Sequence, residues 1–206
     1  MNSVLENSKV TFFNLLAGQW DSKQNLNDIA AKLAAGLDEM DLGPDETVLD
    51  IGCGTGNLTQ ALLNRLSPAG RVVAVDSSPR MIEIARDKIT DERVTWHTVD
   101  AARLPLAAAC CDRVICCAVW PHFDDPAAVA TELVRALRAG GWLHVWHVIS
   151  RERVNEIHAA AGAAVRQDTL PPAAETARVL ERAGLRITAV IDTAERYLVS
   201  GQKSER

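Results

Sequence analysis

One short stretch organises the chain: Val48-Leu49-Asp50-Ile51-Gly52-Cys53-Gly54-Thr55-Gly56-Asn57-Leu58. It reads as an apolar strand, a turn with glycine at three alternate positions, and the start of a helix. Glycine adopts positive φ and has no Cβ, and the first amides of a helix have no partner within the helix. The stretch therefore predicts a loop whose backbone comes close to a ligand.

Strands and helices alternate after this loop. We expect strands over 47–51, 71–76, 94–99, 113–119 and 142–149, and helices over 57–66, 79–88, 126–138, 151–161 and 171–183. Ser78-Pro79 and Asp125-Pro126 are typical helix starts, and Gly140-Gly141 should end the third of these helices. Strands over 185–191 and 196–201 should form a terminal hairpin. This order predicts an α/β fold, a Rossmann-like, mostly parallel seven-stranded sheet with helices on both faces and a C-terminal antiparallel hairpin.

Two further helices, over 3–18 and 24–40, precede the first strand, and Gly43-Pro44 separates them from it. They lie outside the repeating unit, so they form an N-terminal lid or pack on the edge of the sheet. We expect a single domain over 1–206, with a helical lid over 1–42 and the Rossmann-like core over 45–206.

Composition and charge narrow the class of protein. The 206 residues carry a formal net charge of −5 and contain no run of Lys or Arg, which argues against a nucleic-acid partner. The first 20 residues are too polar for a signal peptide, and no apolar stretch approaches the roughly 20 residues that cross a bilayer. We expect a cytoplasmic protein without a membrane partner, present as a monomer or homodimer.

The cysteines are odd in number and include two adjacent pairs, without any C-x-x-C spacing: Cys53, Cys110, Cys111, Cys116 and Cys117. This pattern is not that of a secreted disulfide framework. The favoured interpretation is that they are reduced and pack as small hydrophobic side chains. A thiol site for a soft metal or metalloid at Cys110 and Cys111 is the alternative, and no metal is expected.

Three sequence features indicate which class of ligand the glycine loop binds. The position of the third glycine in the dinucleotide pattern G-x-G-x-x-G is Asn57. Asp50, just before the glycines, would repel a pyrophosphate but suits a ligand with an ammonium group. Asp76 ends the next strand, where a carboxylate typically binds ribose hydroxyls, although this feature fits both kinds of ligand. The P-loop lysine is absent, which excludes phosphoryl transfer of that type.

With these features the sequence resembles the class I S-adenosylmethionine-dependent methyltransferases, strongly over about 45–149. The motifs that carry the resemblance are Val48 to Gly56, Val73-Ala74-Val75-Asp76-Ser77-Ser78-Pro79-Arg80-Met81, Asp100-Ala101 with Leu104-Pro105, Asp112-Arg113-Val114, and Leu137-Arg138-Ala139-Gly140-Gly141. The most similar branch includes the ubiquinone and menaquinone methyltransferases and many small-molecule enzymes. The opening stretch from Phe12 to Asp21 resembles that branch's lid segment.

The resemblance implies S-adenosylmethionine as cofactor and S-adenosylhomocysteine as product. Matching positions place the glycines under the methionine and ribose, Asp50 near the amino group, Asp76 on the ribose, and Asp100 on the adenine amino group. Ser77 and Met81 flank the adenine in this reading. The full set of expected cofactor contacts is Asp50, Gly52, Cys53, Gly54, Gly56, Asn57, Asp76, Ser77, Met81, Asp100, Ala101 and Ala118.

The expected reaction is in-line transfer of the methyl group to a small-molecule acceptor, which needs a general base only when the acceptor must lose a proton. After the fourth strand the chain has Ala118-Val119-Trp120-Pro121-His122, unlike the Asn/Asp-Pro-Pro-Tyr of enzymes that methylate nucleobase amino groups. Candidate catalytic residues are His147 and His122, as base or substrate contact. Candidate substrate contacts are Trp20, Trp120, Arg151 and His158, whereas His144, on the opposite strand face from His147, reads as a core histidine.

Several alternatives stay open. A metal site of His122, His147 and His158 is conceivable, and a clamp for an anionic substrate built on Arg151 is slightly favoured over it. A nicotinamide-dependent oxidoreductase would need a third glycine and a Tyr-x-x-x-Lys pair, but the single tyrosine, Tyr197, lacks that context. A non-catalytic nucleotide-binding protein of the same fold is compatible with every motif.

Overall fold

The computed structural model describes residues 3–205, so residues 1–2 of the predicted lid and residue 206 lie outside the described part. The chain forms two compact units, residues 1–100 and residues 101–206, here called the first and second units. Residues 3–205 contain seven strands, three in the first unit and four in the second.

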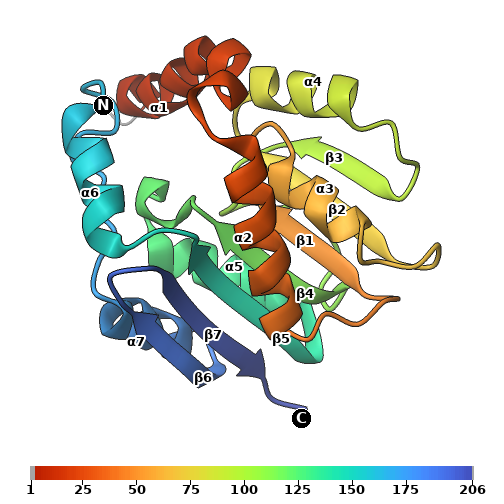
Figure 1. Cartoon of the computed structure of the whole chain (residues 1–206). Helices are drawn as coiled ribbons and strands as arrows, with labels where there is room; N and C mark the ends of the chain where they lie inside the picture. Colours follow the sequence, from red (N-terminus) through yellow and green to blue (C-terminus); the bar gives the residue numbers. More distant parts are fainter. Residues whose placement is uncertain (1–2, 206) are drawn as a thin grey trace. The chain divides into compact units, whose positions relative to one another are not determined.

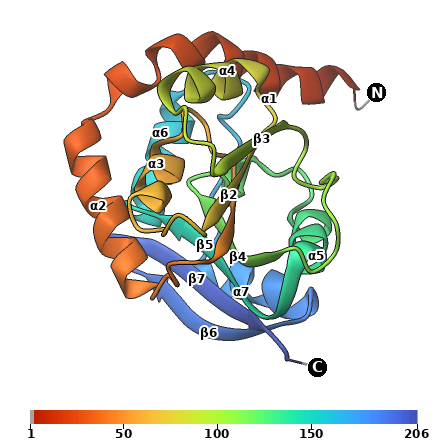
Figure 2. The same cartoon turned by 90° about the vertical axis from the view of Figure 1, so that its right-hand side faces the viewer.

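The first unit opens with helices and continues into a parallel sheet of order β3-β2-β1 (Figure 1). Figure 2 shows helices α1 and α4 side by side. The elements are α1 (Ser3–Leu16), η1 (Ala17–Gln19), η2 (Asp21–Lys23), α2 (Leu26–Glu39), β1 (Thr47–Ile51), α3 (Asn57–Leu63), β2 (Arg71–Asp76), α4 (Pro79–Lys88) and β3 (Val94–Thr98).

Local sequence chemistry explains these boundaries. Val48 and Leu49 in β1 and Val72 in β2 are fully buried, as expected of parallel strands covered on both faces. Ser78 caps α4 by accepting a hydrogen bond from the Met81 amide, and Pro79 occupies the first helical position, as predicted. Because the three strands are parallel, their carboxyl ends meet at one edge of the sheet.

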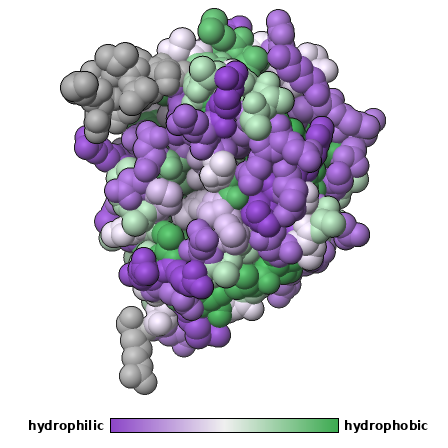
Figure 3. All heavy atoms as spheres, turned by 90° about the vertical axis from the view of Figure 1, so that its left-hand side faces the viewer, coloured by the Kyte–Doolittle hydropathy of each residue, from purple (hydrophilic) through white to green (hydrophobic). Residues whose placement is uncertain are grey.

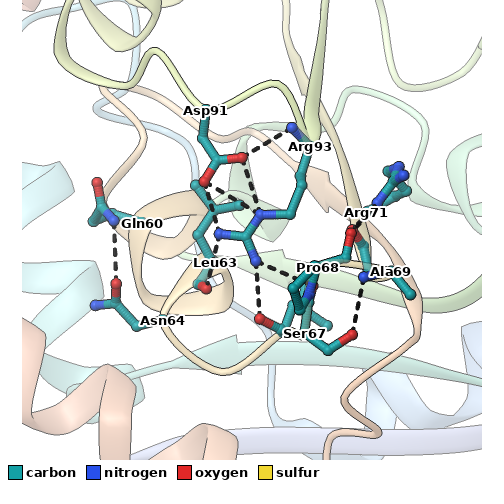
Figure 4. A network of polar contacts seen from close by, with 11 residues as sticks. Gln60, Leu63, Asn64, Ser67, Pro68, Ala69, Arg71, Asp91 and Arg93 are labelled. Atoms are coloured by element: carbon teal, nitrogen blue, oxygen red, sulfur yellow. Dashed lines mark hydrogen bonds and ion pairs between the residues drawn. The ribbon is translucent and has the colours of Figure 1, made fainter.

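An arginine network holds the far end of α3 (Figure 4). The Arg93 guanidinium donates hydrogen bonds to the backbone carbonyls of Leu63, Leu66 and Ser67, at 2.8 to 3.3 Å. Asp91 binds the same guanidinium, with Oδ2 2.7 Å from Nη2. The last carbonyls of a helix have no partner within it, so Arg93 supplies donors at the end of the helix that starts at the glycine loop.

The second unit has a sheet of order β4-β5-β7-β6 (Figure 1), in which β4 and β5 are parallel and the remaining pairs are antiparallel. Helix α5 packs on β5, and α7 packs on β6 and β7. The elements are β4 (Cys111–Cys117), η3 (Trp120–His122), α5 (Pro126–Ala136), β5 (Leu137–His147), α6 (Arg151–Ala160), α7 (Ala173–Arg182), β6 (Leu185–Asp192) and β7 (Tyr197–Lys203).

The predicted bounds of β5 and β4 in this unit were wrong. Strand β5 begins at Leu137 rather than Trp142, so Gly140-Gly141 lies within it instead of ending α5. A Cβ on Gly141 would lie 2.8 Å from the backbone oxygen of Asp112, so the glycine is required by the close approach of the backbone beside β4. Strand β4 covers Cys111–Cys117 rather than 113–119, because the chain turns at Ala118, whose φ is +56°.

His144 is a core histidine, as predicted. Its Nε2 accepts a hydrogen bond from Arg113 Nη1 at 2.9 Å, and its Nδ1 lies 2.8 Å from Ser200 Oγ. An arginine nitrogen only donates, so the proton of the neutral imidazole is on Nδ1 and is donated to Ser200. Burial, followed by the positive charge of Arg113, lowers the pKa of His144 to about 3.

The surface in Figure 3 is covered mostly by hydrophilic residues, with hydrophobic residues in small separate groups. Among the described residues, the large hydrophobic side chains that are exposed are Leu15, Leu26, Ile157 and Val190. No helix within residues 3–205 is long and apolar enough to cross a membrane.

Acid should destabilise the fold through His144. Its folded-state pKa of about 3 lies below the ordinary 6.5, so between these values the unfolded chain binds a proton that the folded chain does not. The free energy of unfolding therefore falls as the pH is lowered through this window. In urea unfolding, His144→Gln should reduce this pH slope by up to about 1.4 kcal/mol per pH unit. Equal slopes for the two proteins would contradict a neutral, buried His144.

Candidate cofactor and acceptor sites

The glycine loop lies at the carboxyl end of β1, and its three glycines have φ of +69°, +52° and +85° at Gly52, Gly54 and Gly56. These values lie in the left-handed region that glycine adopts without a steric penalty. The Val75 carbonyl in β2 accepts hydrogen bonds from the amides of Gly52 and Cys53, at 2.8 and 3.0 Å. The loop is thus tied to the neighbouring strand.

Asp76, the last residue of β2, uses both carboxylate oxygens to hold the loops on either side of it. Oδ2 accepts from the Gly54 amide at 2.9 Å, and Oδ1 accepts from the Ser78 amide at 2.8 Å. Charge-assisted bonds of this kind are stronger than neutral ones. One carboxylate therefore sets both the glycine loop and the start of α4, and it lies where the resemblance expects ribose hydroxyls.

Gly54 and Gly56 differ in what surrounds them. A Cβ on Gly54 would have no protein atom within 4 Å, whereas one on Gly56 would lie 2.9 Å from Ile89 Cδ1. A side chain at Gly56 would therefore require the end of the Ile89 side chain to move. Gly54 leaves open space beside a loop whose backbone is held in place, and this arrangement fits the approach of a nucleoside ligand.

Asp50 is only 1% exposed, and its Oδ2 accepts a hydrogen bond from Thr59 Oγ1 at 2.7 Å. Burial, and to a smaller extent the negative charge of Asp76, raises the pKa of Asp50 to about 7. A nearby ammonium group would stabilise the ionised form, so this buried acid fits the predicted role. Burial also raises the pKa of the Cys53 thiol well above its usual value, which keeps that side chain protonated.

The other expected cofactor residues of the first unit have different surroundings. Met81 is buried, and Ser77 and Asp100 are exposed. Asn57 begins α3, and its side chain contacts Asp21 and Lys88.

Sequence reasoning did not assign Asp21 and Asn14 to the site. Asp21 Oδ1 accepts from Thr55 Oγ1 at 2.7 Å and from Asn57 Nδ2 at 3.1 Å, and its Oδ2 pairs with Lys88 Nζ at 3.0 Å. Burial alone would raise the pKa of Asp21, but the hydrogen bonds from Thr55, Lys88 and Asn57 hold it below its usual value. The position of Asp21 directly after Trp20 in the lid-like segment was the available signal.

Asn14 in α1 joins the N-terminal segment to the start of α4. Its Oδ1 accepts from Ser78 Oγ at 2.6 Å and from the Arg80 amide at 3.2 Å. Trp20, an expected substrate contact, is half-buried and packs edge-on against Phe13 with 6.0 Å between ring centroids. The N-terminal segment of the first unit is therefore bound to the loops that follow β1 and β2.

In the second unit, the carboxyl ends of β4 and β5 bring several expected residues to one edge. Ala118 follows β4 with φ of +56°, and its amide donates to the Trp146 carbonyl at 2.9 Å. A positive φ is unfavourable for alanine, and strain of this kind is often found at functional sites. Trp120 is buried in η3, and Ala101, at the start of the unit, is also buried.

His122 and His158 both contact Asp168, which sequence reasoning missed because nothing marks its loop. His122 Nδ1 lies 2.7 Å from Asp168 Oδ2, and His158 Nδ1 lies 2.6 Å from the Asp168 backbone oxygen. The two imidazole centroids are 4.8 Å apart. Burial lowers the pKa of His158, and the charge of His122 adds to this, against an opposing effect of Asp168.

His147 ends β5 and is 2% exposed, with a buried Nε2 that has no hydrogen-bond partner among the described residues. Its ring packs edge-on against Tyr197 at 5.6 Å between centroids. Burial, followed by the charges of His122 and His158, lowers the pKa of His147 to about 3. A buried polar atom without a partner is rare in proteins, so Nε2 is a candidate contact for a polar ligand atom or a water.

Arg151, an expected substrate contact, and Asn155 both lie in α6 and have partners of their own. The Arg151 guanidinium binds Asp192 at 2.9 Å and Glu152 at 2.7 Å, and the Asn155 side chain binds the backbone of Leu170. Arg151 borders an open hollow of about 480 Å³ together with Ser150, Asp192 and Thr193. Within residues 3–205, no three His, Cys, Asp or Glu side chains are arranged as metal ligands.

Comparison with known proteins shows what part of the chain is similar to. Residues 49–145 match a family described as a methyltransferase domain. A malonyl-(acyl-carrier protein) O-methyltransferase from Acetivibrio thermocellus is 38% identical over 109 residues, 52% of this chain and 38% of that protein. A ubiquinone/menaquinone biosynthesis C-methyltransferase from Bordetella parapertussis is 35% identical over 104 residues, 50% of this chain and 40% of that protein. The chain spans less than half the length of these curated relatives.

A solved structure extends the likeness to the fold. A SAM-dependent methyltransferase from Aquifex aeolicus superposes with a TM-score of 0.70 at 22% identity, over 82% of this chain and 88% of that one. This likeness concerns the fold alone, and it confirms the predicted Rossmann-like α/β class with a mostly parallel seven-stranded sheet and a C-terminal antiparallel hairpin. The family implies S-adenosylmethionine as the cofactor. Residues 49–145, just under half of the chain, are therefore similar to the methyltransferase domain family, in agreement with the resemblance of its motifs to the S-adenosylmethionine-dependent methyltransferases.

Proposed function

We propose that the chain transfers a methyl group from S-adenosylmethionine to a small-molecule acceptor by in-line displacement. When bound, the cofactor supplies a methyl group on a positively charged sulfur; the bond from the acceptor to carbon forms as the carbon–sulfur bond breaks, and the electron pair stays on sulfur. The observation that carries the proposal is the Asp76 carboxylate, which holds the Gly54 amide beside open space. Positioning and exclusion of water are the main contributions such a site can make.

Each residue's role follows from its place in the first or second unit. Asp50 binds the cofactor's ammonium group, and Asp76 binds its ribose. The further cofactor contacts that we propose are Gly52, Cys53, Gly54, Gly56, Asn57, Ser77, Met81, Asp100, Ala101 and Ala118. His147 and His122 act on the acceptor, which also contacts Trp20, Trp120, Arg151 and His158. Arg151 makes this contact while its guanidinium also binds Asp192 and Glu152.

We further propose that residues 1–42 act as a lid within a single methyltransferase domain made of both units. The bonds from Asp21 to Thr55, Asn57 and Lys88 support this role, because they tie the segment to the glycine loop. We propose a cytoplasmic protein, monomeric or homodimeric, that does not act on nucleic acid; the formal net charge of −5 supports the last point.

Calorimetry separates this function from the alternatives. The protein should bind S-adenosylmethionine and not NADH, and Asp76→Asn should weaken cofactor binding at least about tenfold because charged hydrogen bonds to the ribose are lost. Asp87→Asn, an equal charge change at an exposed position of α4, should bind normally. Binding of NADH alone would contradict the proposal. An unchanged affinity in Asp76→Asn, with its circular dichroism intact, would refute the role of Asp76.

Two glycine variants separate ligand contact from packing. Gly54→Ala should lose cofactor affinity but cost only about 1 kcal/mol of stability, since its positive φ is the single penalty and no protein atom lies within 4 Å of the new Cβ. Gly56→Ala should cost roughly 1 to 3 kcal/mol more, because its Cβ would overlap Ile89. Urea unfolding and titration with S-adenosylhomocysteine measure both effects. Wild-type affinity in Gly54→Ala would contradict the placement of the ligand.

Cofactor binding should depend on pH through Asp50. Its pKa of about 7 in the free protein should fall when the ammonium group binds, because opposite charge favours the carboxylate. Binding then releases a proton, and affinity should rise about tenfold from about pH 6 to about pH 8. Calorimetry in buffers of different ionisation enthalpy measures this release. Asp50→Asn, which can still accept from Thr59, should show neither effect; proton release that persists in this variant would assign it to another group.

A further inference from the structure

Asp168 is built into the second unit although it lies in the connection between α6 and α7. Asn155 of α6 clamps the Leu170 backbone: its Oδ1 accepts from the amide at 2.7 Å, and its Nδ2 donates to the carbonyl at 3.2 Å. The Asp168 amide donates to the Val165 carbonyl at 3.0 Å, and Val165 and Leu170 are buried. The segment around Asp168 is therefore anchored on both sides.

The two histidines on Asp168 have defined proton positions. A backbone carbonyl can only accept, so the Nδ1 of His158, 2.6 Å from the Asp168 oxygen, carries a proton. A carboxylate likewise only accepts, so the Nδ1 of His122, 2.7 Å from Asp168 Oδ2, carries a proton as well. In a neutral His122 the lone pair is then on Nε2, which is the form of imidazole that can take a proton.

We propose that Asp168 is a positioning residue that orients His122 as the proton acceptor of the site, and that the methyl acceptor is a hydroxyl compound. This inference rests on the proposed methyltransferase function. A carboxylic acid is already ionised at neutral pH and needs no base, whereas a hydroxyl group keeps its proton until a base removes it. The arrangement of an imidazole between a carboxylate and a hydroxyl is the general geometry that activates such a group.

The proton balance is simple. The hydroxyl proton passes to Nε2 of His122, and the imidazolium that forms is stabilised by the Asp168 carboxylate on its other side. The oxygen uses its freed electron pair for the bond to the methyl carbon. His158 holds the Asp168 backbone and packs 4.8 Å from His122 between ring centroids.

His147 gives an independent indication of a ligand at this edge. Its buried Nε2 lacks a hydrogen-bond partner among the described residues, and both His122 and His158 lie close enough to influence its charge. Placing a polar atom of the acceptor against this nitrogen would satisfy it. The edge where β4 and β5 end is also where open α/β sheets bind their ligands.

A first experiment reads the tautomer directly. In the full chain labelled with ¹⁵N-histidine, His122, assigned by His122→Gln, should carry its proton on Nδ1. Asp168→Ala should shift it toward the Nε2–H form, which neutral imidazole favours in water. Asp168→Asn keeps an acceptor oxygen and should preserve Nδ1–H; if the alanine variant fails to fold, the loss of kcat expected below for Asp168→Asn tests the proposal instead. An Nε2–H state in the wild type, or no change in folded Asp168→Ala, would overturn the proposal.

A second experiment tests the acceptor class. The protein and S-adenosylmethionine with a ¹³C-methyl group are incubated with a library of phenols and alcohols and with carboxylates and amines of the same carbon skeletons. Methylated hydroxyl compounds are expected, and Asp168→Asn should lower kcat by about 100-fold or more at unchanged KM and cofactor affinity. Glu181→Gln, an equal charge change at an exposed site on α7, should behave as wild type.

The outcomes distinguish this inference from the function on which it rests. Failure of the wild type to bind S-adenosylmethionine would contradict the methyltransferase proposal itself. Cofactor binding together with products from carboxylates or amines only, or without any methylated hydroxyl compound, would overturn the role of His122 and Asp168 alone. Equal loss of kcat in Asp168→Asn and Glu181→Gln would assign the effect to net charge rather than to positioning.

Discussion

The Asp76 carboxylate is the group on which the first unit's site depends. It accepts from the Gly54 amide and from the Ser78 amide, so one side chain determines the positions of two loops from different strands. Those loops lead into α3 and α4, and the Arg93 network holds the opposite end of α3. The site is thus preorganised by bonds that the protein makes without a ligand, which limits the ordering cost of binding.

Charge is used differently at the two candidate sites. In the first unit, burial disfavours the ionised form of Asp50 and raises its pKa. A cationic ligand nearby would stabilise that ionised form. In the second unit, burial keeps His147 neutral, while His122 is paired with the Asp168 carboxylate. The environments of these two histidines differ, and such differences separate acid, base and binding roles within one site.

Local signals predicted the parts of the fold that local chemistry controls. The Gly52–Gly56 loop, the bounds of β1 and β2 and the Ser78 cap follow from residues adjacent in sequence. The start of β5 was wrong because Gly140-Gly141 resembles a helix stop, and only the nearby Asp112 backbone explains it. His144 was recognised as a core residue from its place in the strand, although its partners Arg113 and Ser200 were not foreseen.

Contacts between distant segments were beyond the reach of sequence patterns. Asp21 binds Thr55, which is 34 residues away in the sequence, and Lys88, which is 67 residues away. Asp168 binds His122, which is 46 residues away. Asp168 has no neighbour in sequence that marks it as part of a site, and Asp21 has only its position after Trp20 in the lid-like segment.

The central claim is that the loop between β1 and α3 binds the nucleoside of S-adenosylmethionine, and a crystal structure with S-adenosylhomocysteine tests it most directly. The account predicts the ribose hydroxyls within hydrogen-bond distance of Asp76, the amino group on the side of Asp50, and the ligand in the open space beside Gly54. A ligand bound elsewhere, or a ribose without contact to Asp76, would contradict it.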